Sequence, residues 1–203
     1  MKLSVFFLLL CATLSAQTTL ILTGPVNVLP GASVNFTLST TGTVAAGLEW
    51  KFTLPTGYPM SEVVGAAGTA SSKVLACSTD GTHCLLYGQT VSVVSPGVIA
   101  TVTLTVPSNA TPGPVALTPA PPASGTDAAT ATGAATLVTV TGLTVNILDL
   151  RDINADGVVN ATDVTLMASE VVSGTCANNP NGTGKCDLLQ VFAVLLKALN
   201  LVP

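Results

Sequence analysis

The sequence contains many short stretches in which apolar and polar residues alternate one by one. In ASVNFTLST, Val34, Phe36 and Leu38 alternate with polar residues, and the pattern repeats in GLEWKFTL (47–54) and GVIATVTLTV (97–106). Successive side chains of a strand point to opposite faces, so alternation predicts strands with one buried face. Similar runs, separated by Gly, Pro, Ser and Thr turns, are LILT, SEVVGAA, KVLAC, CLLYG, PVALT and ATLVTVTGLTVNI. About eight or nine short strands without a helical period predict an all-β sandwich of the jelly-roll kind.

The alternation also predicts which side chains form the core. Trp50 and Phe52 share a strand face with two leucines, so we expect them to be buried. The same reasoning places Ile99 on the polar face of its strand, beside threonines. Only Tyr58 and Tyr87 then remain as rings that could form a flat sugar-binding surface, and two rings make a weak platform.

The first residues have the layout of a secretory signal peptide. MKLSVFFLLLCATLSAQ has a positive Lys2, an apolar run from Val5 to Leu10 and small residues ending at Ala16. A transmembrane anchor needs about 20 apolar residues, which this run does not supply. We therefore predict that residues 1–16 are removed and that the mature protein is secreted, at the cell surface or in the extracellular medium, with no transmembrane anchor.

Export changes how the cysteines are interpreted. The mature chain keeps four of them, and an even number in an oxidising compartment predicts disulfides. Proximity in the sequence favours the pairs Cys77–Cys84 and Cys176–Cys186. A zinc–thiolate cluster is not expected, because the spacing is wrong and His83 is the only histidine.

Charge divides the chain into two parts. Charged residues are only 8% of the sequence. Between residues 17 and 147 they are Glu49, Lys51, Glu62, Lys73, Asp80 and Asp127. Acidic residues cluster from Asp149 onward, so we predict a sandwich domain at 17–147 and a small helical domain at 148–203. The formal net charge of −4 argues against a nucleic-acid partner, which requires basic patches.

Residues 152–163, DINADGVVNATD, match the pattern of an EF-hand-type calcium loop. Calcium takes six to eight hard oxygen ligands, and such a loop presents them at fixed positions around a glycine at position six, here Gly157. The expected ligands are Asp152, Asn154, Asp156, the Val158 carbonyl, Asn160 and Asp163. The apolar Val159 should pack beneath the loop.

A helix is predicted directly after this loop, and a strand directly before it. DVTLMASEVVSG places Val164, Met167, Ala168, Val171 and Val172 at helical spacing and ends at Gly174. TVNILDLR, which precedes the loop, is strand-like, so the entering helix of an ordinary EF-hand is missing.

A shift of 27 residues aligns a second copy of this unit with the first. Its glycine is Gly184, Cys186 takes the place of Val159, and the repeated helix face is Val191, Val194, Leu195 and Leu199. The oxygen-bearing positions are Asn179, Asn181, Thr183, Lys185 (through its carbonyl), Asp187 and Gln190. With one carboxylate, this loop should bind calcium far more weakly than the first. We therefore expect one Ca²⁺ site in the first loop, leave a second Ca²⁺ in the other loop open, and expect a Cys176–Cys186 disulfide to stabilise that second loop.

A calcium loop followed by one helix, in two copies, resembles a dockerin domain. The preceding strands, VLPGASVNFTLS, GLEWKFTLPTGYPMSEVVGAAG and PGVIATVTLTVPSNATPGPVALT, resemble a cohesin domain, which is related in fold to carbohydrate-binding sandwiches. The resemblance implies an exported bacterial protein that takes part in calcium-dependent cohesin–dockerin binding and is linked to extracellular polysaccharide degradation.

An enzymatic function is not expected. The sequence has no Ser/His/Asp arrangement and no pair of catalytic carboxylates, and Glu49 and Glu62 lie on different elements without a visible polar neighbourhood. His83 is interpreted as a surface residue. Two other functions stay open: a carbohydrate-binding sandwich that carries a dockerin and binds polysaccharide, and a self-contained surface protein whose two domains dock on each other.

Overall fold

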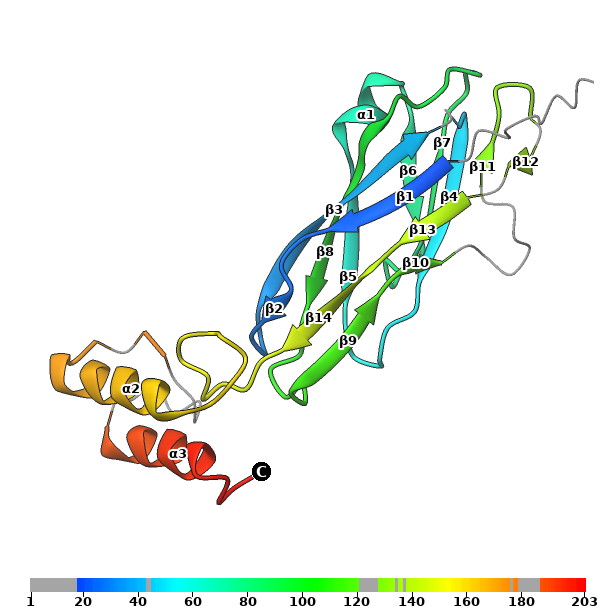
Figure 1. Cartoon of the computed structure of the whole chain (residues 1–203). Coiled ribbons are helices and arrows are strands. Elements are labelled where there is room, and N and C mark those ends of the chain that lie inside the picture. Colours follow the sequence, from blue (N-terminus) through cyan, green and yellow to red (C-terminus); the bar gives the residue numbers. More distant parts are fainter. Residues whose placement is uncertain are drawn as a thin grey trace, which may run out of the picture.

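A computed structural model describes residues 18–42, 45–120, 128–133, 135–136, 138–175, 177–178 and 187–203 of the chain. Two β-sheets pack face to face, and two helices lie beyond one end of the strands (Figure 1). The predicted signal peptide, residues 1–16, lies outside the described residues.

The first sheet is built almost entirely from antiparallel neighbours. Its strands, in spatial order, are β13 (Val138–Thr141), β1 (Thr18–Thr23), β3 (Ser33–Gly42), β8 (Gly97–Thr105) and β5 (Met60–Val64). The pairing of β1 with β13 is parallel, and the other three pairings are antiparallel. The first strand of the sandwich sequence, β1, therefore pairs with the late strand β13 at one edge of this sheet.

The second sheet faces the first, and a small third sheet lies at the end nearest the helices (Figure 1). The second sheet has the order β12 (Ala135–Thr136), β11 (Ala128–Ala129), β4 (Gly47–Phe52), β7 (His83–Tyr87) and β6 (Val74–Cys77), and β10 (Pro119–Ala120) also pairs with β4. The third sheet consists of β2 (Asn27–Val28), β14 (Leu143–Ile147) and β9 (Gly113–Leu117).

Large apolar side chains from the facing sheets fill the interior. Trp50 and Phe52 of β4 and Phe36 of β3 are each at most 1% exposed, which confirms the predicted core face. Burying aromatic side chains of this size is a dominant source of stability in a sandwich. The predicted β-sandwich is therefore confirmed for the described part of residues 17–147.

Two local features depart from the predicted alternation. Ile99 is fully buried, although the sequence pattern placed it on the polar face. The register between β3 and β8 shifts at Leu38/Ser39, where Ile99 is the extra residue of a bulge. The second departure is a short helix, α1 (Ala66–Ala70), where SEVVGAA predicted only a strand. Its Gly65 approaches the Val98 carbonyl so closely that a Cβ would lie 2.6 Å from that oxygen.

The outer face of the first sheet carries hydroxyl and amide groups instead of charges. Ser33 Oγ lies 2.8 Å from Thr105 Oγ1, and Thr103 Oγ1 donates to Asn35 Oδ1 at the same distance. On the neighbouring strands, Thr19 Oγ1 lies 2.8 Å from Thr139 Oγ1. Cross-strand hydroxyl pairs of this kind stabilise neighbouring strands without long charged side chains.

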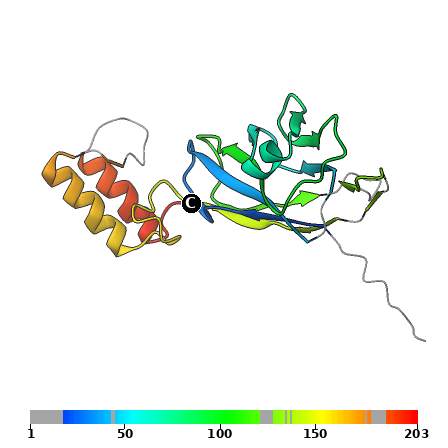
Figure 2. The same ribbon diagram turned by 90° about the horizontal axis from the view of Figure 1, so that it is seen from above.

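The helices α2 (Ala161–Ser173) and α3 (Leu188–Ala198) pack against each other away from the sandwich (Figure 2). Met167 and Val194 are fully buried between them, and α2 ends at Gly174 in the left-handed conformation (φ 72°), as predicted. The prediction that Val172 belongs to the buried face is wrong, because this side chain is 89% exposed. It lies in the last turn of α2, directly before the helix end at Gly174.

Polar contacts join the helical segment, which we define as the described part of residues 148–203, to the end of the sandwich. The Asn27 side chain donates a hydrogen bond to the Ala155 carbonyl at 3.3 Å. A hollow between the two parts is lined by Gly113 and Ile147 on one side and by Val158 and Lys197 on the other. Among the described helices, none is both long and apolar enough to cross a membrane.

Candidate metal-binding loop

The loop from Asp152 to Asp163 begins after β14 and ends inside the first turn of α2. No helix precedes it in the described residues 148–151, as the sequence predicted. Gly157 has a φ of 95°, the left-handed region that glycine adopts without strain, and Ala155 also lies there with φ 58°. These two residues turn the chain so that both ends of the loop approach each other.

Two carboxylates at the base of the loop are buried. Asp152 is 3% exposed and accepts hydrogen bonds from the backbone N–H groups of Asp156 (3.1 Å) and Gly157 (2.7 Å). Asp163 is fully buried and accepts from Ile153 (2.8 Å), Asn154 (3.2 Å) and Asn160 (2.8 Å). Asp152 and Asp163, the first and last predicted ligands, therefore stabilise the loop by accepting backbone hydrogen bonds at its buried base.

The remaining predicted ligands lie on the exposed rim of the loop. Asn154 Nδ2 donates to Asp156 Oδ2 at 2.8 Å, and the Val158 N–H donates to Asp156 Oδ1 at 2.9 Å. The Asn160 side-chain oxygen accepts from the Thr162 N–H at 2.7 Å, and Asn160 is the N-cap of α2. With Asp163 at the third helical position, this forms a capping box, which links the loop to the start of the helix.

The neighbouring Asp149 has cationic partners, whereas the carboxylates of the loop have none in the described part of the chain. Asp149 has two cationic partners, with Arg151 Nε at 2.8 Å and Lys197 Nζ at 3.6 Å. Burial acts to raise the pKa of Asp149, but the Arg151 hydrogen bonds and the two positive charges outweigh it, so this pKa lies below its usual value. In the described part of the chain, no Lys, Arg or His forms a salt bridge with Asp152, Asp156 or Asp163.

The donor set fits a hard divalent cation. It comprises three carboxylates, two side-chain amides and one carbonyl, and oxygen ligands of these kinds are the ones that calcium prefers. The three carboxylates do not share one tight cluster, since the only described group of three His, Cys, Asp or Glu with ligand atoms within 4.8 Å lies elsewhere. Their oxygens instead accept hydrogen bonds from loop N–H groups, and two such carboxylates are buried without a cationic side chain.

The second predicted loop is only partly covered by the structure. Asn179, Asn181, Thr183 and Lys185 lie outside the described residues, as do Cys176 and Cys186, so their predicted roles stay predictions. Asp187 is the N-cap of α3 and accepts from the Leu189 N–H at 3.0 Å, as Asn160 does for α2. Gln190 is fully buried like Asp163. The 27-residue shift therefore aligns both the helix caps and the buried closing residues.

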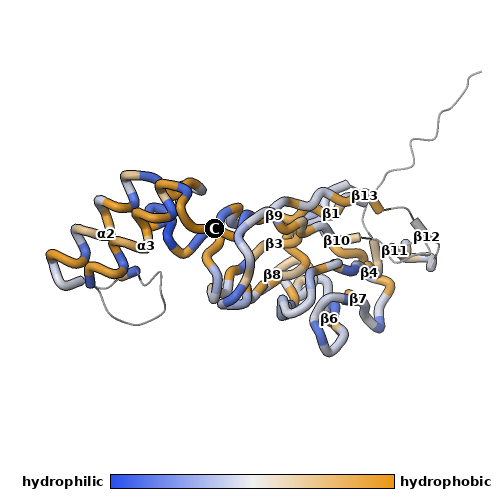
Figure 3. Tube along the Cα trace, turned by 90° about the horizontal axis from the view of Figure 1, so that it is seen from below, coloured by the Kyte–Doolittle hydropathy of each residue, from blue (hydrophilic) through white to orange (hydrophobic). Residues whose placement is uncertain are grey.

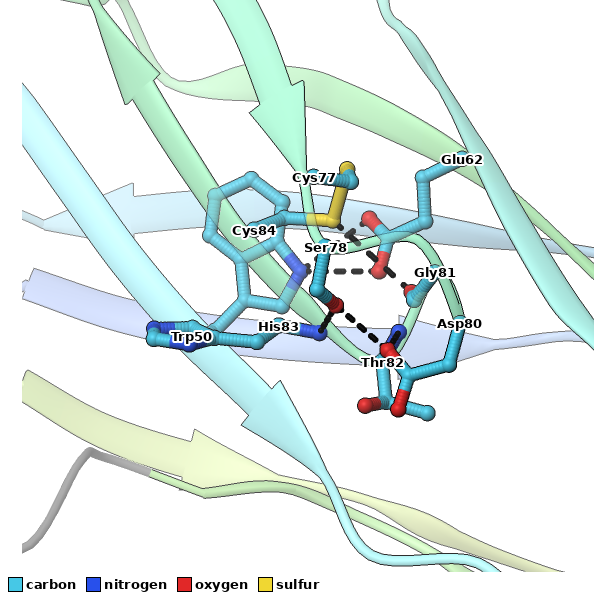
Figure 4. The surroundings of a disulfide bond; sticks show 9 residues. All are labelled: Trp50, Glu62, Cys77, Ser78, Asp80, Gly81, Thr82, His83 and Cys84. Atoms are coloured by element: carbon cyan, nitrogen blue, oxygen red, sulfur yellow. Dashed lines mark hydrogen bonds between the residues drawn. A yellow bond between two sulfur atoms is a disulfide. The ribbon is translucent and has the colours of Figure 1, made fainter.

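The Cys77–Cys84 disulfide is present, as predicted, and it belongs to a group that the sequence did not reveal (Figure 4). Trp50 Nε1 donates to both carboxylate oxygens of Glu62, at 3.1 and 3.0 Å. An oxygen of Glu62 and the two sulfur atoms lie within 4.8 Å of one another. Burial raises the pKa of Glu62 to about 7, although the Trp50 hydrogen bond acts to lower it. The prediction that Glu62 has no polar neighbourhood is therefore wrong.

Glu49 also has a polar partner that the sequence analysis missed. His83 Nε2 lies 2.6 Å from Glu49 Oε1 on neighbouring strands β7 and β4. Both side chains are substantially exposed, at 44% and 35%, so the interpretation of His83 as a surface residue is correct. Period-two alternation on two paired strands could have suggested this contact, but only once the register of the pair was known.

Hydrophobic residues make up much of α3 (Figure 3), and several of them are exposed. Leu188 and Leu189 are each 71% exposed on α3, and Phe192, one turn later, is 60% exposed. Residues three and four apart on a helix lie on one side, so these three side chains form one apolar patch. We call it the α3 patch.

Comparison with known proteins identifies solved structures with a similar fold. No protein-family model matches it, and no curated protein has a detectably similar sequence. Among solved structures, a non-cellulosomal cohesin from the archaeon Archaeoglobus fulgidus is similar, with 15% identity and a TM-score of 0.51 over 66% of this chain and 92% of that one. A type I cohesin from Pseudobacteroides cellulosolvens has 15% identity and a TM-score of 0.48 over 64% and 92%. The likeness to the archaeal cohesin shows that this mostly β-sheet structure has a cohesin-like β-sandwich fold.

Proposed function

We propose that this chain is an exported, non-catalytic interaction protein whose helical segment binds one calcium ion and, in that form, binds a protein partner. The partner is of the cohesin–dockerin type, and the chain acts in extracellular polysaccharide degradation. A second function, direct binding of polysaccharide by the sandwich, would leave the helical segment as the attachment module.

One observation carries this proposal: the loop at 152–163 buries two carboxylates that no cationic side chain neutralises in the described chain. Burying an ionised carboxylate is costly unless hydrogen bonds and an opposite charge compensate it. Backbone N–H groups supply hydrogen bonds to Asp152 and Asp163, but they carry no net charge. A divalent cation would supply the missing charge.

Each residue of the loop would contribute to holding calcium. Asp152, Asp156 and Asp163 would supply negative charge, and the Asn154 and Asn160 side chains and the Val158 carbonyl would supply neutral oxygens. The Asn160 oxygen already accepts from Thr162, so it would use its second lone pair. When bound, calcium would provide positive charge that stabilises the loop and, through the capping box, the start of α2.

The protein partner is supported by two features. The α3 patch exposes three large apolar side chains that a partner could cover. The sandwich has a cohesin-like fold, and the similar archaeal structure is a cohesin that is not part of a cellulosome. The described aromatic side chains favour protein over sugar, because Trp50 and Phe52 are buried and Tyr87 is the only ring of the sandwich that is more than about one-third exposed.

The direct test is capture of a partner from the secreted proteins of the source organism by the full-length protein, with calcium and with a chelator. We expect a protein to be captured in calcium and lost in the chelator. The matched control is the Asp152→Asn variant, which keeps the shape of the side chain and should capture nothing in either buffer.

A soluble-polysaccharide pull-down runs alongside to separate the two functions. Retention of polysaccharide, unchanged by the chelator and by Asp152→Asn, would favour the carbohydrate-binding function. Capture of protein that survives chelation, while circular dichroism shows the helices lost, would contradict calcium-dependent binding.

A further inference from the structure

We propose that the Cys77–Cys84 disulfide exchanges with external dithiols, and that Glu62 is the proton donor and acceptor for the buried Cys84 sulfur. This inference does not depend on the calcium loop or on the partner. It assigns a chemical activity to a cluster between the two sheets, where their edge strands β5 and β6 contact each other. Figure 4 shows the side chains of this cluster.

The two sulfur atoms differ in access. Cys77 is exposed on the edge strand β6, whereas Cys84 on β7 is fully buried. An external thiolate can therefore attack the Cys77 sulfur, and the Cys84 sulfur must then leave as a thiolate in an apolar site. A buried thiolate without a compensating charge is unfavourable, so this step requires a nearby proton.

Glu62 is placed to supply that proton. Its carboxyl oxygen lies within 4.8 Å of both sulfurs, and its side chain points to the disulfide in Figure 4. The Trp50 indole N–H donates to both carboxyl oxygens and so holds the group in place. The Gly81 carbonyl oxygen lies 3.8 Å from Cys84 Sγ, where it can accept the weak hydrogen bond of the newly formed thiol. Because burial raises the pKa of Glu62 to about 7, the carboxyl group can both donate and accept a proton near neutral pH.

The other ionisable groups near this edge are directed elsewhere. Lys51 of β4 and Tyr87 of β7 are exposed to solvent. His83 pairs with Glu49 on the outer face, and Asp80 accepts from Ser78 and Thr82 in the turn between β6 and β7. Lys73 donates to the Thr90 carbonyl. The neighbouring elements β8 and α1 carry no ionisable side chain. Glu62 is therefore the one described acid or base that faces the sulfurs.

The exchange proceeds in two steps, in which atoms, electrons and protons are conserved. A dithiol reductant, as thiolate, attacks Cys77 Sγ and forms a mixed disulfide, the Cys77–Cys84 bond breaks, and the proton of Glu62 passes to the Cys84 thiolate. The second thiolate of the reductant then attacks its own sulfur in the mixed disulfide and releases the Cys77 thiolate to solvent. The protein gains two electrons, and the reductant leaves as a disulfide. In the reverse direction, ionised Glu62 accepts the Cys84 proton.

The test measures the rate at which dithiothreitol reduces this disulfide in the full-length oxidised protein from roughly pH 5 to roughly pH 9. Alkylation and mass spectrometry of the peptides that contain Cys77 and Cys84 separate this pair from the other cysteines. Each rate is divided by the thiolate fraction of dithiothreitol, so that only the protein's own titration remains. We expect this corrected rate to fall about tenfold as Glu62 loses its proton above pH 7. In Glu62→Gln, which still accepts from Trp50, we expect a corrected rate without this fall.

Two results would overturn the proposal. One is a pH profile of Glu62→Gln that matches the wild type within about twofold, since Glu62 would then only accept the indole hydrogen bond. The other is reduction that occurs only after the sandwich unfolds in urea.

If Glu62→Gln does not fold, the wild type still provides a test. Trp50 is the only tryptophan of the chain and donates to Glu62, so its fluorescence should titrate with this carboxyl group. The midpoint of that titration must coincide with the midpoint of the fall in corrected rate. Different midpoints would contradict the role of Glu62.

Discussion

The sandwich holds a partly buried carboxyl group and the helical segment holds fully buried ones, and the two parts surround them differently. Glu62, inside the sandwich, has one neutral donor, the Trp50 indole, and its pKa is raised to about 7 because burial dominates. Asp163, inside the helical segment, accepts three backbone N–H bonds at the base of a loop with two further carboxylates. A carboxyl group with a single neutral donor is suited to exchanging a proton, whereas one that accepts several backbone N–H bonds in an acidic loop is suited to holding a cation.

Removing one carboxylate from the loop should produce the largest effect in the molecule. We expect Asp152→Asn to weaken calcium binding by at least about a hundredfold, because affinity rises with the charge of the ligand set. Isothermal calorimetry of the full-length protein would measure it. The matched control is Asp187→Asn, which alters the second loop and should change the tight affinity by less than about threefold. Two sites of equal affinity in the wild type would contradict the contrast between the loops.

A change of pH should act on the sandwich in the direction set by Glu62. Its pKa is about 7 when folded and near 4.5 when unfolded, so the folded state binds more protons between these values. The stability contributed by the protonated group is fully present below pH 4.5 and is lost as pH rises to about 7. We expect a loss of at most about 3 kcal/mol in the free energy of unfolding.

Urea unfolding followed by the fluorescence of Trp50 would measure this loss, because the only tryptophan lies in the sandwich. Glu62→Gln should show no loss across the same interval. A wild-type stability that is constant from pH 4.5 to 7 would mean that Glu62 stays ionised when buried.

Asp149 should give a pH dependence of the opposite sign in the helical segment. Its pKa is lowered when folded, so the stability that it contributes is present above its unfolded value of 3.8 and is lost as pH falls below that. We expect Asp149→Asn to destabilise the helices by about 1 kcal/mol at neutral pH, from the lost ion pairs with Arg151 and Lys197.

Thermal melting followed by circular dichroism at neutral and acid pH would test this expectation. The control is Asp80→Asn in the β6–β7 turn, which should leave the melting of the helices unchanged. A melting curve of Asp149→Asn that equals the wild type at neutral pH would rule out a stabilising role for these ion pairs.

The smallest effect is expected from the exposed pair His83–Glu49. Ion pairs that face water contribute little, so a double-mutant cycle of His83→Ala and Glu49→Ala should give a coupling below about 0.5 kcal/mol. The same urea unfolding assay would measure it. A larger coupling would show that an exposed pair can stabilise this sandwich as much as a buried carboxyl group does.

The sequence predicted the features that depend on local spacing. The helix α2, its end at Gly174 and the Cys77–Cys84 pair all follow from residues close in the chain, whereas calcium binding by the loop before the helix stays a prediction. The buried face of β4 followed from period-two alternation. The bulge at Ile99 was missed because one extra residue in a strand reverses the alternation and leaves no mark in the composition.

The group around Glu62 was missed for a different reason. Glu62, Trp50 and the disulfide come from strands of two different sheets, and only the packing of those sheets brings them together. Nothing in the sequence near Glu62 indicates that its strand lies at an open edge. Val172 was misassigned because helical spacing marks a possible apolar face but not how wide its buried part is.

The hydroxyl pairs on the outer face of the first sheet have a consequence for how the protein responds to salt. Mobile ions screen interactions between charges over about 8–10 Å at moderate salt, but they have little effect on hydrogen bonds between neutral groups in contact. Ser33, Thr103 and Thr139 present such neutral groups. Contacts made by this face should therefore keep their strength in brine as in fresh water, while those of the acidic loop should weaken as the ionic strength rises.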